Sequence, residues 1–196
     1  MKMDIILAGV GGQGILSVAA AIGYAAINEG LHIKQAEVHG MSQRGGAVQS
    51  HFRISDQPIY SELIPLGKAD MILSLEPMEA LRYLPYLGET GWLISNEKPM
   101  VNIVDYPDAD ALYTSIRQVE NHVLIDTDKL ARRVGTAKAS NMVLLGAASA
   151  HLPLKEKSLE KGIRQLFKAK GEKIMEMNIN AFKAGRSLAL EKDAVT

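Results

Sequence analysis

The chain has 196 residues and ordinary globular composition, with 47% hydrophobic, 22% charged and 5% aromatic residues, which excludes disordered, collagen-like and coiled-coil proteins. Its formal net charge at pH 7 is zero, so no global field attracts nucleic acid or an anionic membrane. The absence of cysteine excludes cysteine-ligated iron–sulfur clusters, disulfides and a cysteine nucleophile, and we expect a soluble, cytoplasmic protein. The length indicates a single domain over residues 1–196, with a core at about 1–150 and a helical appendage at about 155–191.

The first part of the chain predicts three strands and one helix. Residues 4–8, 31–38 and 47–54 are rich in aliphatic and β-branched side chains, as strands are. A helix is predicted over residues 12–29. It is apolar almost all round, so we expect either other helices of the chain or self-association to cover a second side of it. Glycines and Gln13 interrupt the apolar run, which therefore predicts neither a signal peptide nor a membrane span.

The rest of the chain predicts alternating strands and helices. Strands are expected at residues 71–75, 92–95, 101–104 and 123–125. Helices are expected to start at Glu76-Pro77, after a cap at Asp126 or Thr127, and after a cap at Ser140, with two more within residues 155–191. This alternation favours an α/β, Rossmann-like fold: a doubly wound, mostly parallel sheet followed by C-terminal helices.

A glycine-rich turn separates the first predicted strand from the first predicted helix. Its G-x-G-x-x-G spacing, in this context, is typical of dinucleotide-binding turns, where a helix N-terminus meets a phosphate. The candidate ligand or partner contacts are Gly9, Gly11, Gly12, Gln13 and Gly14. Glu37 lies near the end of the second predicted strand, about where a ribose-binding carboxylate would sit. The alternative is that the glycines only tighten the turn between strand and helix.

A second unusual segment follows the carboxyl end of the second predicted strand, the edge where open α/β sheets bind ligands. Its candidate contacts are His39, Gly40, Ser42, Gln43, Arg44, Gly45 and Gly46. The guanidinium of Arg44 can bind a phosphate or a carboxylate through two hydrogen bonds, and the glycines permit close approach of the backbone. We favour a functional contact over an exposed turn, because the eight-residue segment 39–46, without an apolar anchor, makes a poor turn.

The sequence offers no catalytic residues and no metal ligands at recognised spacings. The five histidines share no ligand spacing, and His51 is interpreted as a structural histidine. No G-x-S-x-G motif is present, and no nucleophile–base pair is visible. Glu76 ends a predicted strand and either faces the sheet edge or acts as a helix cap or solvated carboxylate.

Two segments together resemble a known family. GVGGQG at residues 9–14 and EVHGMSQRGGAVQSHFR at residues 37–53 are similar to the small subunit of the 2-oxoacid:ferredoxin oxidoreductases. HGMSQRGG is most similar to the indolepyruvate-type members. LSLEPMEALRYLPYL at residues 73–87 and SNMVLLGAA at residues 140–148 also resemble segments of this family. The resemblance covers about residues 1–150.

The resemblance implies a function that spacing alone does not. Such enzymes convert a 2-oxoacid, here an aryl 2-oxoacid such as indolepyruvate, and coenzyme A to acyl-CoA and carbon dioxide, reducing ferredoxin. Thiamine diphosphate and iron–sulfur clusters would lie on a larger partner subunit, so the isolated chain would hold no cofactor and be inactive. Two alternatives stay open: a free-standing NAD(P)-binding dehydrogenase that uses residues 9–14 and Glu37, and a non-enzymatic interaction module.

Overall fold

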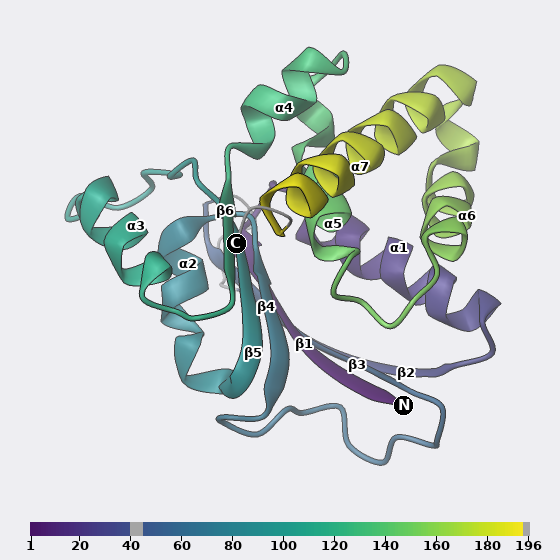
Figure 1. The fold of residues 1–196 in the computed structure, drawn as a ribbon, viewed down its shortest axis with the longest axis horizontal. Helices are drawn as coiled ribbons and strands as arrows, with labels where there is room; N and C mark the ends of the chain where they lie inside the picture. The colour runs from purple at the N-terminus through teal and green to yellow at the C-terminus, as the bar shows by residue number, and fades with distance from the viewer. Residues whose placement is uncertain (40–44, 194–196) are drawn as a thin grey trace.

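The structure, a computed structural model, describes residues 1–39 and 45–193. Its described strands form a six-stranded sheet in the order β2-β3-β1-β4-β5-β6, with helices on both faces (Figure 1). The strands are β1 (Lys2–Val10), β2 (His32–His39), β3 (Ala47–Ser55), β4 (Ala69–Ser74), β5 (Leu87–Asn96) and β6 (His122–Ile125).

The sheet is mixed, and β1 lies inside it. Strands β1, β4, β5 and β6 pair in parallel, whereas β3 is antiparallel to both β1 and β2. Because β3 runs against both of its neighbours, β1 and β2 point the same way and end at the same edge of the sheet. The α/β fold with a mostly parallel sheet is confirmed.

Helices cover both faces of the sheet. Helices α1, α4, α5, α6 and α7 contribute to the larger core on one face, and α2 and α3 contribute to the smaller core on the other (Figure 1). The helices are α1 (Ile15–Asn28), α2 (Pro77–Arg82), α3 (Ala109–Arg117), α4 (Thr127–Arg133), α5 (Ser140–Ala148), α6 (Glu156–Phe167) and α7 (Glu172–Asp193). Strand β1 contributes side chains to the cores on both faces of the sheet. Ile5 and Leu7 lie in the larger core and Ile6 lies in the smaller one, because successive side chains of a strand point to opposite faces. No helix in the described part of the chain is long and apolar enough to cross a bilayer.

The second cover of α1 comes from within the chain. Helix α6 lies against it so closely that a Cβ atom built on Gly162 would be 2.4 Å from the carbonyl oxygen of Ala21. Leu159, Ile163 and other residues of the C-terminal helices belong to the same buried core as α1. This face of α1 therefore does not need a second copy of the protein to cover it.

Helices α5 and α7 cross with their backbones in contact. A Cβ atom on Gly146 would lie 1.9 Å from the carbonyl oxygen of Phe182, and one on Gly185 would lie 2.0 Å from that of Val143. No side chain fits at either position, so the crossing depends on two facing glycines. It buries α5 almost completely, from Asn141 to Ala148.

Two local predictions were wrong. Residues 101–104 form no strand; they lie in the connection between β5 and α3, where Val104 is fully exposed. A short β-branched run predicts a strand only if a neighbour can pair with it, and none does here. Ser140 does not cap α5 but is its first residue; the hydroxyl of Thr136 caps the short 3₁₀ turn that precedes it.

At the amino-terminal edge of the strands, a buried ion pair fixes the connection between β3 and β4. Nε and Nη2 of Arg53 lie 2.8 and 3.0 Å from the two carboxylate oxygens of Asp4, which is fully buried. Nη1 of the same arginine donates to the carbonyl oxygens of Ser61 and Leu63. Arg53 therefore joins β1, β3 and the connection through one side chain.

His51 is a structural histidine, as predicted. It is 5% exposed; its Nδ1 accepts a hydrogen bond from the Ile64 N–H at 3.0 Å, and its ring packs edge-on against Tyr86. Burial, with the nearby Arg53 charge, lowers the pKa of His51 below its ordinary value. Protonation of Nδ1 would also break the bond from Ile64, so the folded state favours the neutral ring.

This histidine makes stability depend on pH. Because its pKa is lower in the folded state, the unfolded chain binds the proton first as pH falls through about 6.5, and the folded state loses stability below that pH. We expect His51→Gln, whose amide oxygen can still accept from Ile64, to show a smaller fall in melting temperature than the wild type between pH 8 and pH 5. Parallel melting curves across that range would contradict this assignment.

Candidate functional site

A chain of side-chain amides ties together the strand ends at the carboxyl edge of the sheet. Gln13 Oε1 accepts from the Val10 N–H at 2.7 Å, and Gln13 Nε2 donates to the carbonyl of Leu75 at 3.1 Å. Asn96 Nδ2 donates to the same carbonyl at 3.2 Å, and its Oδ1 accepts from the Thr127 N–H at 3.1 Å. The ends of β1, β4 and β5 and the start of α4 are thereby held at fixed spacing.

The glycine turn uses several of its own donors internally. The N–H of Gly11 donates to the carbonyl of Gly46 at 2.8 Å, and that of Gln13 donates to Val10 at 3.1 Å. Gly12 and Gly14 have φ of 100° and 85°, which side chains rarely adopt. The structure thus gives the glycines a clear conformational role, while contact of residues 9–14 with a ligand or partner stays a prediction.

The carboxamide of Asn141 is hydrogen-bonded to the residue that precedes α1. Its Nδ2 donates to the carbonyl of Gly14 at 3.1 Å, and a Cβ atom on Gly14 would lie 2.7 Å from that nitrogen. A glycine is therefore needed here both for its φ and for space. The contact fixes the N-terminus of α5 beside that of α1.

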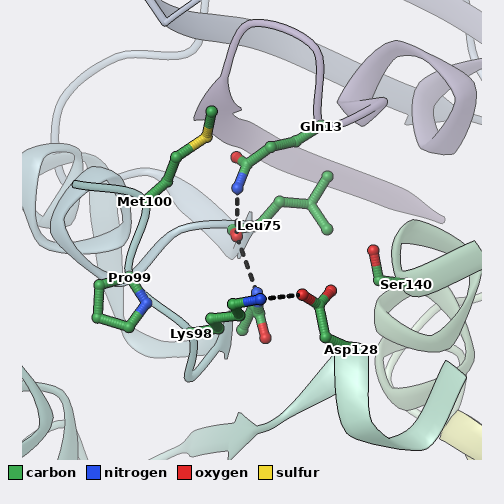
Figure 2. Close-up of a pocket in the computed structure, with 8 residues that line it drawn as sticks. Gln13, Leu75, Lys98, Pro99, Met100, Asp128 and Ser140 are labelled. Atoms are coloured by element: carbon green, nitrogen blue, oxygen red, sulfur yellow. Dashed lines mark hydrogen bonds and ion pairs between the residues drawn. The ribbon is translucent and has the colours of Figure 1, made fainter. Parts of the chain in front are cut away.

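Two cavities open on either side of Gln13. The first, of about 190 Å³, lies at the ends of β4 and β5 and has an ion pair at its rim, with Lys98 Nζ 2.9 Å from Asp128 Oδ2 (Figure 2). The second, of about 470 Å³, lies between the start of α1 and helix α7 and is bordered by Lys138 and Lys170. Both combine apolar walls with polar groups, as small-molecule sites do.

The structure brings the two predicted motifs together. Gly45 and Gly46 lie beside the glycine turn: besides the bond from Gly11 to Gly46, the Gly45 N–H donates to the carbonyl of Gly11 at 3.4 Å. His39 ends β2, its backbone paired with Val48. Gly40, Ser42, Gln43 and Arg44 lie outside the described residues, so their contact with a ligand or partner stays a prediction.

Glu76 is a helix cap that is completely buried, which settles its open role. Its Oε2 accepts from the Glu79 N–H at 2.8 Å at the start of α2. Its Oε1 accepts from the Met100 N–H at 3.3 Å and from the hydroxyl of Tyr106. Burial and this bond to a carboxylate raise the pKa of the Tyr106 phenol, so it remains a donor at any physiological pH.

Glu37 does not occupy the ribose-binding position of a dinucleotide site. It lies on β2 opposite Ser50 of β3, and β3 separates β2 from β1. Two strand spacings, about 10 Å, therefore lie between its backbone and that of β1. In dinucleotide-binding folds the acidic residue follows the strand next to the glycine turn, so this geometry argues against the dehydrogenase alternative.

Several residues at this edge were not singled out from the sequence. They are Asn96, Lys98, Asn102, Asp128 and Asn141. Asn96 directly follows a predicted strand, a position that could have drawn attention; Asn141 gave no such signal, because its partner Gly14 is 127 residues away. Among the described residues, no group of three or more histidine, aspartate or glutamate side chains could hold a metal ion.

Known proteins are similar to this chain in sequence and in fold. The chain is 35% identical to indolepyruvate oxidoreductase subunit IorB of Archaeoglobus fulgidus, over 97% of this chain and 96% of that protein. It is 29% identical to ketoisovalerate oxidoreductase subunit VorA of Methanothermobacter thermautotrophicus, over 97% of this chain but only 37% of that protein. Its fold matches the crystal structure of a keto/oxoacid ferredoxin oxidoreductase gamma subunit from Geobacter sulfurreducens, with a TM-score of 0.71, 25% identity, and coverage of 96% of this chain and 99% of that one.

These likenesses agree with the resemblance carried by the two glycine-rich motifs. The family of pyruvate ferredoxin/flavodoxin oxidoreductases matches residues 4–188, which include both motifs, every strand but the start of β1, and most of α7. Since that match extends over nearly the whole length, the chain belongs to the pyruvate ferredoxin/flavodoxin oxidoreductase family.

Proposed function

We propose that this chain is the small subunit of an indolepyruvate-type 2-oxoacid:ferredoxin oxidoreductase. The complex would convert an aryl 2-oxoacid and coenzyme A to acyl-CoA and carbon dioxide, passing two electrons to ferredoxin. The identity of 35% to IorB over almost the full length of both proteins carries this proposal. The HGMSQRGG segment adds support, because its sequence resembles the indolepyruvate-type members of the family.

The cofactors of that reaction would be held by a larger chain. The sequence has no cysteine, so cysteine-ligated iron–sulfur clusters have no ligands here. Thiamine diphosphate on the partner would supply the decarboxylating carbon centre, and the clusters would carry the electrons. This chain's contribution is therefore binding and positioning at the shared face.

The carboxyl edge of the sheet has the features needed for that contribution. The bonds that Gln13 and Asn96 make to Leu75 give it a fixed shape without any ligand. Lys138 and Lys170 border the larger cavity, and their positive charges suit the phosphates of coenzyme A. We place the substrate or coenzyme A side of the complex at this edge, over residues 9–14 and 39–46.

Reconstitution tests the proposal. The purified chain alone should bind no iron and oxidise no 2-oxoacid, whereas its native partner should be a larger thiamine-binding chain. Mixing the two should give indolepyruvate-dependent reduction of ferredoxin that requires coenzyme A. Oxidation of a 2-oxoacid by the isolated chain would overturn the subunit assignment. Tight binding of NADH to the isolated chain would overturn it too, and would favour the dehydrogenase alternative.

Arg44 should matter to that activity and not to folding. Its guanidinium can bind a phosphate of coenzyme A or thiamine diphosphate, or a carboxylate of the partner, through two hydrogen bonds. We expect Arg44→Ala to lower turnover of the reconstituted complex at least about tenfold, equivalent to about 1.4 kcal/mol, with an unchanged melting temperature. Arg44→Lys should recover little, because an ammonium group cannot form the paired bonds.

A surface arginine far from this edge provides the matched control. Arg117 is exposed at the end of α3, so Arg117→Ala should leave turnover as in the wild type. If Arg44→Ala turns over as fast as the wild type, residues 39–46 are only an exposed turn. A collapse of its melting temperature would make the role of Arg44 structural.

A further inference from the structure

Residues 100–104, the aliphatic segment, place large apolar side chains in water. Four of the five are aliphatic or methionine, and the exposed fractions are 72% for Val101, 47% for Ile103 and 100% for Val104. Single exposed apolar residues are normal on a protein surface, whereas a contiguous group marks an interaction site. The group lies in the connection between β5 and α3, at the carboxyl edge of the sheet.

The connection that carries these side chains is fixed on both sides. Buried Glu76 accepts hydrogen bonds from the Met100 N–H and from the Tyr106 hydroxyl, which lie on either side of the exposed side chains. Before the segment, the carbonyl of Glu97 accepts from the Tyr113 hydroxyl at 2.7 Å. Apolar side chains on a prearranged backbone bind a partner without the entropy cost of ordering a loop.

The aliphatic segment is also joined to the candidate site. Within it, Asn102 Nδ2 donates to the carbonyl of Gly45 at 2.6 Å, so the segment touches the second glycine-rich motif. Met100 lines the 190 Å³ cavity at the ends of β4 and β5. Whatever covers the aliphatic segment therefore lies over the edge to which we assign coenzyme A or the substrate.

We propose that the aliphatic segment is a docking contact for the larger, thiamine-binding chain of the complex. The proposal rests on the proposed function, which requires that chain to meet this edge. In VorA, sequence similar to this chain makes up 37% of a longer protein, so there the same unit is covalently attached to the rest of that chain. Here the corresponding neighbour would be a separate subunit.

Charge specifies the partner surface further. The exposed carboxylates of Asp105, Asp108 and Asp110 follow the aliphatic segment directly. A complementary surface is an apolar hollow bordered on one side by lysine or arginine. Such a border would speed association and make it sensitive to salt, while burial of Val101 and Val104 would set the dissociation rate.

The test is binding of purified subunits. The double variant Val101→Asp/Val104→Asp should raise the dissociation constant for the larger chain at least about tenfold, the size expected when anchoring residues are lost from an interface. Its melting temperature should stay unchanged, since neither side chain is buried in the isolated chain. Val101→Leu/Val104→Leu should bind as the wild type does.

Ile27 offers a matched control for the introduced charge. It is 57% exposed near the end of α1, toward the opposite edge of the sheet, so Ile27→Asp should leave the dissociation constant within about twofold of the wild type. Asp105→Lys should slow association and reduce its dependence on salt.

The outcomes separate the two proposals. If the wild-type chain does not bind the larger chain at all, the proposed function fails. If the wild type binds and Val101→Asp/Val104→Asp binds equally well, the proposed function stands and the docking contact is overturned. If the isolated wild type is a dimer that this variant dissociates, the occupant is a second copy, and the proposal is again overturned.

Discussion

Gly185→Ala is expected to lower the free energy of unfolding by about 3 kcal/mol or more, the upper range for overpacking a core. The added methyl group would lie 2.0 Å from the carbonyl oxygen of Val143, which is backbone and cannot rotate away. Helices α5 and α7 must then move apart, and α5 is buried along nearly its whole length. For a protein of this size the melting temperature should fall on the order of 10 °C, which calorimetry or circular dichroism would measure.

Two further variants make this prediction specific. Gly23→Ala places the same methyl group in α1 at ordinary distances, 3.5 Å from Ile33 and 3.7 Å from Phe52, so helix propensity should make it neutral or stabilising. Gly146→Ala/Gly185→Ala should cost less than the sum of the two single changes, because either one separates the helices. A wild-type melting temperature for Gly185→Ala would show that the helices cross with more room than described.

Arg53→Leu should lower the free energy of unfolding by about 3 kcal/mol, the usual cost of removing one partner of a buried ion pair. It would leave the Asp4 carboxylate fully buried, with the half-exposed Lys2 as its remaining ion-pair partner among the described residues. It would also free the carbonyls of Ser61 and Leu63, so the connection between β3 and β4 should become sensitive to proteases. Melting and limited proteolysis measure the two effects separately.

The neighbouring lysine distinguishes a buried pair from a surface one. Lys2 approaches the same carboxylate at 2.7 Å, but its side chain is 57% exposed, and Lys2→Ala should change stability by less than about 1 kcal/mol. Asp4→Leu/Arg53→Leu should be less destabilised than Arg53→Leu, because no carboxylate is then buried alone. If Asp4→Leu/Arg53→Leu and Arg53→Leu were equally stable, the unpaired Asp4 carboxylate would contribute nothing to the loss of stability.

Regular elements with strong apolar patterns could be predicted from the sequence, and weakly patterned ones could not. The helix that became α1 was expected because apolar side chains recur throughout it. Helix α3 was not expected, since only Leu112 and Ile116 are buried in it. The position of β3 between β1 and β2 depends on pairing between strands far apart in the sequence, which local composition does not encode.

The candidate site could be located from the sequence, but its internal bonds could not. Strand ends and glycine-rich motifs indicated the correct edge, and Gly11 and Gly46 do meet there. Gln13 was expected to contact a ligand or partner, whereas its amide bonds to Val10 and Leu75. A single glutamine in a turn gives no sign of which distant carbonyl it will reach, because that depends on the packing of strands 60 residues apart.

The packing of α6 on α1 has a consequence for the order in which a nascent chain can fold. Helix α1 is covered by residues 156–167, which follow some 130 residues later in the sequence. Until then its apolar side is open to water, and to chaperones that bind exposed apolar helices. Complete burial of α1 thus requires residues 156–167, so the N-terminal strand and helix cannot reach their final packing until that segment has been synthesised.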